Sequence, residues 1–73
     1  MSARRLGNRL KDVRSERGLT QTDLAALVGV SRKTINTVEN SVFVPSTLLA
    51  LELASTLSTT VERLFYVIDD GGS

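Results

Sequence analysis

Residues 20–40, TQTDLAALVGVSRKTINTVEN, have the pattern of two short helices joined by a tight turn. In each half, apolar residues recur three or four positions apart, which places them on one face of a helix: Leu24 and Val28 in the first half, Ile35 and Val38 in the second. Gly29 falls between the halves, where a reversal of the chain favours a residue that tolerates positive φ. The stretch therefore predicts two helices packed across a turn.

Polar residues mark the start of both helices and the outward face of the second. Thr20 has the type and position of an N-cap, with Asp23 three residues later, and Ser31 is placed to cap the second helix. Once the apolar residues are assigned to the core, four side chains of the second helix are left pointing outward: Arg32, Lys33, Asn36 and Thr37. The second helix is therefore predicted to present hydrogen-bonding groups to a partner outside the protein.

This pattern resembles the helix-turn-helix of the phage repressor/Cro family, also called the XRE family of transcriptional regulators. The residues that carry the resemblance are Gln21, Leu24, Ala25, Val28, Gly29, Val30, Ser31, Ile35, Val38, Glu39 and Asn40. The similarity continues without a gap over residues 8–66, where residues 10–21 match the family's first helix and its glycine stop. The resemblance implies an all-α fold: a compact five-helix domain like the DNA-binding domain of lambda repressor.

Local signals divide the rest of the chain into elements. We expect helices over residues 6–17, 21–28, 32–39, 46–57 and 61–65. Leu6, Leu10 and Val13 share one face of the first helix, and Gly18 ends it. Thr59 and Glu62 have the spacing of a capping box before the last helix.

The two ends of the chain carry weaker signals. Residues 1–5 form either a loose basic arm or an extension of the first helix. Residues 66–68 are aromatic or β-branched and form either a short strand or an extension of the last helix. Residues 69–73 are polar and glycine-rich, which is typical of a frayed tail.

The composition excludes several classes of function. The 73 residues make one domain, and they include no cysteine and no histidine. The remaining carboxylates and hydroxyls form no recognisable catalytic constellation, so we expect neither an enzyme nor a bound metal or cofactor. No apolar run approaches the ~20 residues that span a bilayer. We therefore expect a cytoplasmic, nucleoid-associated protein that does not bind membranes.

Charge is distributed unevenly along the chain, although the formal net charge is only +1. The first forty residues hold eight basic and four acidic residues, whereas the rest holds one basic and four acidic residues. A basic surface that faces a polyanion and an opposite acidic surface would need this distribution. The charges alone fit ordinary solvated helix faces equally well, and the helix-turn-helix pattern favours the polyanion.

The outward face of the second motif helix is chemically suited to read base edges in the major groove of DNA. Arginine and lysine match the acceptors of guanine, asparagine matches the edge of adenine, and a threonine methyl can pack on thymine. The resemblance places base reading on Arg32, Lys33 and Thr37, and we add Asn36 to these base-contacting residues. The alternative is a merely soluble helix face.

Phosphate contacts are predicted at the helix ends. Gln21 begins the first motif helix, where free N–H groups favour an anion, and the family touches a phosphate there. We also assign phosphate contacts to Ser31, Thr34 and Asn40. These residues would position the protein on DNA without reading its sequence.

Arg14 and Glu39 are predicted to have a structural role instead. Glu39 follows Val38 and points back toward the first helix, where the resemblance places Arg14 as its partner in an internal ion pair. Removing one partner of such a pair typically costs about 3–5 kcal/mol, because the other charge is left buried and unpaired. Neither residue is expected to read bases.

The chain departs from the family pattern after Asn40. The family usually has a polar, often basic loop there, whereas residues 41–44 of this chain read SVFV and carry no charge. The apolar residues Val42, Phe43 and Val44 indicate a covered surface, and they could bind a protein partner. Ser58 and Thr59 replace the family's usual glycine and apolar residue, so the following corner could differ.

More apolar side chains are present than one small core can bury, which predicts a homodimer. The resemblance to the helix-turn-helix family implies that this homodimer binds a double-stranded DNA operator. We assign the dimer interface to Phe43, Leu48, Leu51, Phe65, Tyr66 and Ile68. The predicted function is sequence-specific DNA binding and repression of transcription. Two alternatives stay open: an antitoxin- or controller-type regulator that acts with a partner protein, and a helix-turn-helix adaptor that binds protein instead of DNA.

Overall fold

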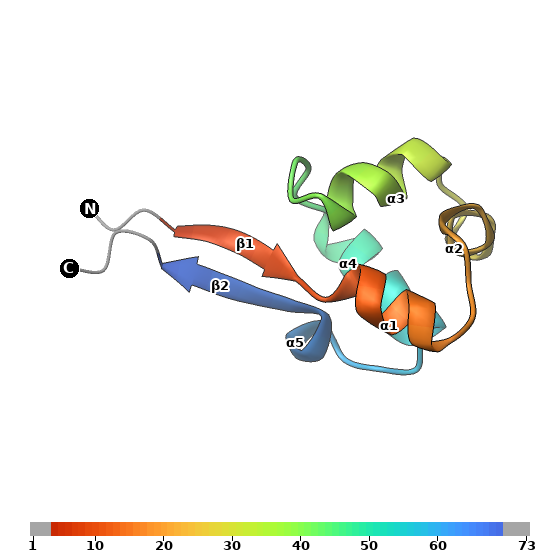
Figure 1. The fold of residues 1–73 in the computed structure, drawn as a ribbon. Coiled ribbons are helices and arrows are strands. Elements are labelled where there is room, and N and C mark those ends of the chain that lie inside the picture. The colour runs from red at the N-terminus through yellow and green to blue at the C-terminus, as the bar shows by residue number, and fades with distance from the viewer. Residues whose placement is uncertain (1–3, 70–73) are drawn as a thin grey trace.

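The structure is a computed structural model that describes residues 4–69. It contains five helices and a two-stranded antiparallel sheet (Figure 1). Their order is β1 (Arg4–Asn8), α1 (Leu10–Glu16), α2 (Gln21–Val28), α3 (Arg32–Glu39), α4 (Thr47–Thr56), α5 (Val61–Leu64) and β2 (Phe65–Asp69). The residues expected to form the beginning of a basic arm, 1–3, and most of a tail, 70–73, lie outside the described part.

The helices pack around one apolar core to which each of them contributes. The fully buried side chains are those of Leu10, Leu24, Ile35, Val38, Leu53, Leu57 and Leu64. In each short helix the apolar residues form one face, and the helices pack together because this face must be removed from water. Of the predicted core positions in the two motif helices, Leu24, Ile35 and Val38 are buried, whereas Val28 is half-buried and packs against the core.

The five expected helices and the short C-terminal strand left open by the sequence are present, but the fold is not purely all-α, because residues 4–8 also form a strand. β1 pairs with β2 in an antiparallel register that joins Arg4 to Asp69 and Asn8 to Phe65. The resulting ribbon projects away from the helices (Figure 1). The first helix begins at Leu10 rather than at residue 6, because the preceding residues bond to β2 instead of to their own helix.

Aromatic and β-branched side chains settle the open alternative at residues 66–68 in favour of a strand. Tyr66 lies over Gly7 on β1, where an added Cβ would come within 2.4 Å of the Tyr66 ring. The Arg9 guanidinium carbon lies 4.7 Å from the centroid of the same ring. Glycine at position 7 therefore makes room for the ring that packs across the ribbon.

Asn8 fastens the base of the ribbon to two helices. Its Nδ2 donates a hydrogen bond to the Val38 carbonyl at 2.9 Å, near the C-terminal end of α3. Its Oδ1 accepts from the backbone N–H of Leu10 at 3.1 Å, at the start of α1. One side chain thus satisfies groups at a negative and a positive helix end.

The helix ends largely follow the predicted caps. Thr20 and Asp23 form a complete capping box on α2, and the hydrogen bonds from Thr20 hold the pKa of Asp23 below its ordinary value. Gly29 ends α2 with a φ of 82°. The capping box expected from Thr59 to Glu62 was wrong, since Thr60 caps α5 by accepting from the Arg63 N–H.

Two serines occupy the left-handed region that suits glycine, with φ values of 59° at Ser41 and 56° at Ser58. Replacing Ser58 with glycine should raise the free energy of unfolding by about 0.5–1 kcal/mol, because the left-handed strain exceeds the entropic cost of glycine. Ser41→Gly should gain less, because it removes the Ser41 hydroxyl that lies 3.4 Å from Asn8 Nδ2. Urea denaturation measures both changes.

Ser15→Gly serves as the matched control. Ser15 lies within α1, where a glycine should lower stability by about 0.5–1 kcal/mol. If Ser58→Gly lost as much stability as Ser15→Gly, the backbone at Ser58 would not be strained.

Candidate nucleic-acid interface

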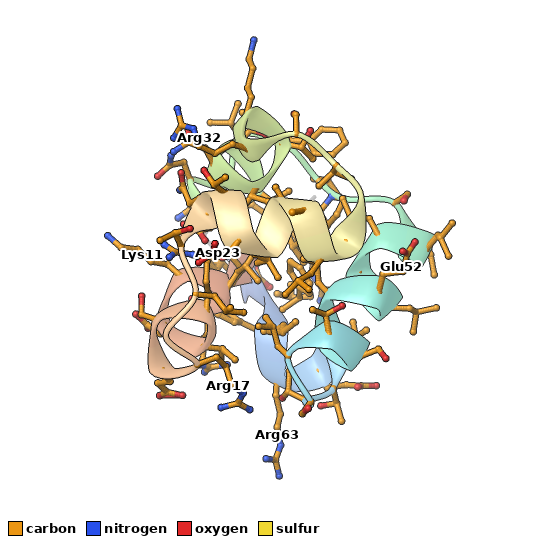
Figure 2. The ribbon with its side chains drawn as sticks, turned by 90° about the vertical axis from the view of Figure 1, so that its right-hand side faces the viewer. Lys11, Arg17, Asp23, Arg32, Glu52 and Arg63 are labelled. Atoms are coloured by element: carbon orange, nitrogen blue, oxygen red, sulfur yellow. The ribbon has the colours of Figure 1, made fainter. Side chains whose placement is uncertain are left out.

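One side of helix α3 packs against the core, and the other side is exposed. Ser31 caps it by accepting from the Thr34 N–H at 3.1 Å, and Ile35 and Val38 are buried. On its other side Arg32 and Lys33 are exposed, whereas Asn36 and Thr37 are half-buried. Figure 2 shows Arg32 projecting outward on the opposite side of the molecule from Arg63.

An ionic cluster lies beneath this helix. Arg14 donates from Nε to Glu39 Oε2 at 2.6 Å and from Nη1 to the Leu19 carbonyl at 2.7 Å. The side chain of Arg14 is only 11% exposed, and that of Glu39 is only 3% exposed. Within residues 4–69, every buried side-chain nitrogen and oxygen has a hydrogen-bond partner. The structure thus brings together the two residues that the sequence analysis assigned to an internal pair.

Gln21 connects this cluster to the exposed face. Its Nε2 donates to Glu39 Oε1 at 3.0 Å, and its Oε1 accepts from Arg32 Nη1 at 3.0 Å. Sequence reasoning assigned Gln21 to phosphate and missed this bridge. The spacing of eleven residues between Gln21 and Arg32 gave no local signal of contact. The bridge links the exposed side chain of Arg32 to the ionic cluster.

The hydroxyl groups predicted to contact DNA make hydrogen bonds within α3. Ser31 Oγ lies 2.9 Å from Thr34 Oγ1, and Thr37 Oγ1 donates to the Thr34 carbonyl at 2.9 Å. Asn40 is exposed at the C-cap of the helix. The hydroxyl of Thr37 is therefore bonded to the backbone, which leaves its methyl group as the part that would contact a base.

Residues 41–44 fold back beside the second half of α3. The backbone N–H groups of Val42 and Phe43 both donate to the Thr37 carbonyl, at 2.9 and 3.2 Å. Their side chains are exposed, and with Lys33, Thr34 and Thr37 they border a cavity of about 310 Å³. The uncharged loop thus forms one wall of a hollow along the outward face of α3.

The residues assigned to a dimer interface fall into two groups. Phe43, Leu48, Leu51 and Tyr66 are exposed and Ile68 is half-buried. Phe65 is only 8% exposed because it packs in the core of its own chain, so its assignment to an interface was wrong. Leu51 and Phe65 also border a cavity of about 340 Å³ at the base of the ribbon.

No three histidine, cysteine, aspartate or glutamate side chains among residues 4–69 gather where they could hold a metal ion. In the same part of the chain, no helix has the length and apolar character needed to cross a membrane.

Known proteins resemble this chain over most of its length. Residues 10–64 match the model of the helix-turn-helix family. The HTH-type transcriptional regulator YgzD of Bacillus subtilis is 35% identical over 63 residues, which are 86% of this chain and 96% of the relative. An HTH-type transcriptional regulator of Methanocaldococcus jannaschii is 41% identical over 63 residues, with the same shares of both chains. The restriction-modification controller protein C.AhdI from Aeromonas hydrophila superposes with a TM-score of 0.71 at 33% identity, covering 75% of this chain and 83% of that one.

Proposed function

This chain belongs to the helix-turn-helix (XRE) family of transcriptional regulators, and on that premise we propose that it binds specific sequences of double-stranded DNA. Helix α3 would enter the major groove, and the protein would act as a homodimer that represses transcription by occupying an operator. The observation that carries this proposal is the bridge from Glu39 through Gln21 to Arg32, which orients a cation on the exposed face of α3.

Orientation of Arg32 matters because base reading depends on geometry. A guanidinium group that is held in place can donate two hydrogen bonds to the O6 and N7 atoms of guanine. Lys33, next along the helix, adds a second cation without a fixed fork. Arg32 and Lys33 are therefore our main candidates for direct readout, with Asn36 and the Thr37 methyl beside them.

Phosphate contacts would flank this readout. A phosphate at the N-terminus of α2 would meet free backbone N–H groups while the Gln21 amide continues to hold Arg32. Ser31, Thr34 and Asn40 lie at or near the two ends of α3, where backbone phosphates pass a helix in the groove. These contacts would set the position of the protein and leave sequence choice to Arg32 and Lys33.

Exposed apolar side chains support the homodimer. Leu48, Leu51 and Tyr66 are all exposed in the single chain, and a core of this size rarely supplies more than about 3–5 kcal/mol. A two-fold dimer would place the two copies of α3 about one DNA turn, ~34 Å, apart.

Sedimentation at tens of micromolar tests the dimer. We expect a species of twice the 7.9 kDa mass of the chain. Leu51→Glu, which places a charge on the exposed side of α4, should shift the protein toward the monomer. Glu52→Gln, a neighbouring change on the same helix, should not. A monomer for the parent protein at these concentrations would rule out the dimer.

A second candidate function is favoured by the exposed loop. Val42, Phe43 and Val44 are consecutive exposed apolar residues beside α3, as expected of a surface that binds a partner protein. An antitoxin- or controller-type regulator would bind its partner protein through this surface and still bind DNA through α3. An adaptor would bind a protein through this surface and would not bind DNA.

The salt dependence of binding to mixed-sequence duplex DNA separates the proposed function from that of an adaptor. Phosphate contacts release counterions, so DNA binding should weaken steeply as salt rises, with a slope of about −0.9 per neutralised phosphate. The proposed function predicts a steep slope. Absence of binding at low salt would favour the adaptor.

A further inference from the structure

We propose that Arg4 and Arg5 of β1 form a second DNA-contacting element, which binds backbone phosphates beside the C-terminal end of α3. This inference rests on the proposed function, since it extends the same DNA-binding surface. It assigns a role to the two arginines of β1, which the proposed contacts of the helix-turn-helix do not include.

The first support is a cavity between the ribbon and the end of α3. It has a volume of about 210 Å³ and is bordered by Arg4, Arg5, Leu6, Asn8, Val38, Ser41, Phe43 and Val44. Three consecutive residues of β1 border it, so the cavity runs along the outer edge of that strand. Both arginines are exposed, although they belong to opposite faces of the strand. A phosphate in this cavity would meet positive charge from the two arginines that border it.

The second support is continuity with the outward face of α3. Phe43 borders this cavity and also the hollow that contains Lys33 and Thr37. One surface therefore leads from the base-reading face of α3, over Phe43, to Arg4 and Arg5. A DNA strand that leaves α3 at its C-terminal end would follow this surface.

The third support is the distribution of charge along that path. Residues 41–44 carry no charge, so their side chains offer a passing phosphate no cation. The two arginines on the other side of the cavity supply the positive charge that the loop lacks. A phosphate oxygen accepts charge-assisted hydrogen bonds from arginine more strongly than from neutral donors.

The fourth support is the anchoring of the ribbon. Asn8 Nδ2 donates to the Val38 carbonyl at 2.9 Å and lies 3.4 Å from Ser41 Oγ, so the end of β1 is bonded to α3 and to the loop that follows it. The competing contact of Arg4 is weak, because its Nε lies 3.7 Å from Asp69 Oδ2 and both side chains are exposed. Such exposed pairs contribute about 0–1 kcal/mol, so a phosphate could replace Asp69.

The test compares the salt slopes of charge-neutralised variants on mixed-sequence duplex DNA. Arg4→Gln and Arg5→Gln should each reduce the magnitude of the slope by about two units, because a homodimer carries each arginine twice, and the double variant should reduce it by about four. Arg63→Gln is the matched control, because Figure 2 shows Arg63 on the opposite side of the molecule from Arg32. Its slope should equal that of the parent.

A variant that keeps both arginines should change DNA affinity in the opposite direction. Asp69→Asn retains both arginines and removes the carboxylate beside Arg4, so it should tighten DNA binding. Glu52→Gln removes an acidic charge from the exposed side of α4 and should tighten DNA binding less. Equal affinities for Asp69→Asn and Glu52→Gln would contradict the proposal.

The failure of this proposal can be told apart from the failure of the proposed function. A flat salt slope for the parent protein would overturn both. A steep parental slope that is shared by Arg4→Gln, Arg5→Gln and Arg63→Gln would overturn only the arginine contacts. Sedimentation of each variant completes the test, because a slope that fell through loss of the dimer would also overturn them.

Discussion

Replacing Arg14 with alanine is expected to lower the free energy of unfolding by about 3–5 kcal/mol, the largest effect among the changes considered. The variant would leave the Glu39 carboxylate, whose side chain is 3% exposed, without its cationic partner. It would also leave the Leu19 carbonyl without its donor. Because small domains have few kcal/mol to lose, the variant should be largely unfolded at 25 °C. Urea denaturation at low temperature measures the loss.

A double variant shows whether the unpaired charge causes the loss. Arg14→Met combined with Glu39→Leu removes both charges and should recover much of the stability. The recovery should be incomplete, because Gln21 Nε2 and the Leu19 carbonyl also lose partners. If Arg14 were instead a phosphate-facing cation, Arg14→Ala would melt like the parent and reduce the salt slope by about one unit for each protomer. That pair of results would contradict the internal pair.

Replacing Arg32 with alanine is expected to relax sequence preference at defined base pairs, with a loss of discrimination of roughly 1–3 kcal/mol there. Binding to mixed-sequence DNA should weaken less, because the phosphate contacts remain. Selection of binding sites from random duplexes, carried out with both proteins, measures the change at each position. Arg63→Ala, made far from α3, should give the same selected sites as the parent.

Gln21 provides a sharper comparison within the same experiment. A residue that only contacts phosphate would, when changed to alanine, weaken binding to all sequences alike. Since Gln21 also holds Arg32 at 3.0 Å, Gln21→Ala should relax preference at the same base pairs as Arg32→Ala, but to a smaller degree. Selected sites for Arg32→Ala that match those of the parent at every position would rule out base reading by Arg32.

The local part of the fold could be predicted from the sequence. Apolar spacing and capping residues act within a few positions, so they predicted α2 and α3 with the bounds that the structure has. The ribbon could not be predicted in this way. Leu6, Leu10 and Val13 have helical spacing, but pairing with a segment about sixty residues away decides the conformation of residues 4–8.

Tertiary packing also decided features of the candidate site. Phe65 follows α5 directly and looked like surplus apolar surface, yet it fills the core where the chain turns into β2. The bridge made by Gln21 depends on side-chain geometry between two helices and the ionic cluster beneath them. The cavity that unites Arg4 and Arg5 with the loop exists only because the ribbon forms.

The central claim is that α3 reads the sequence of duplex DNA. The most direct test compares the affinity of the parent protein for a duplex selected from random sequences with its affinity for a scrambled duplex of the same composition, at physiological salt. The account predicts that the selected duplex binds at least about 10³-fold more tightly. Equal affinity for the two duplexes would contradict it.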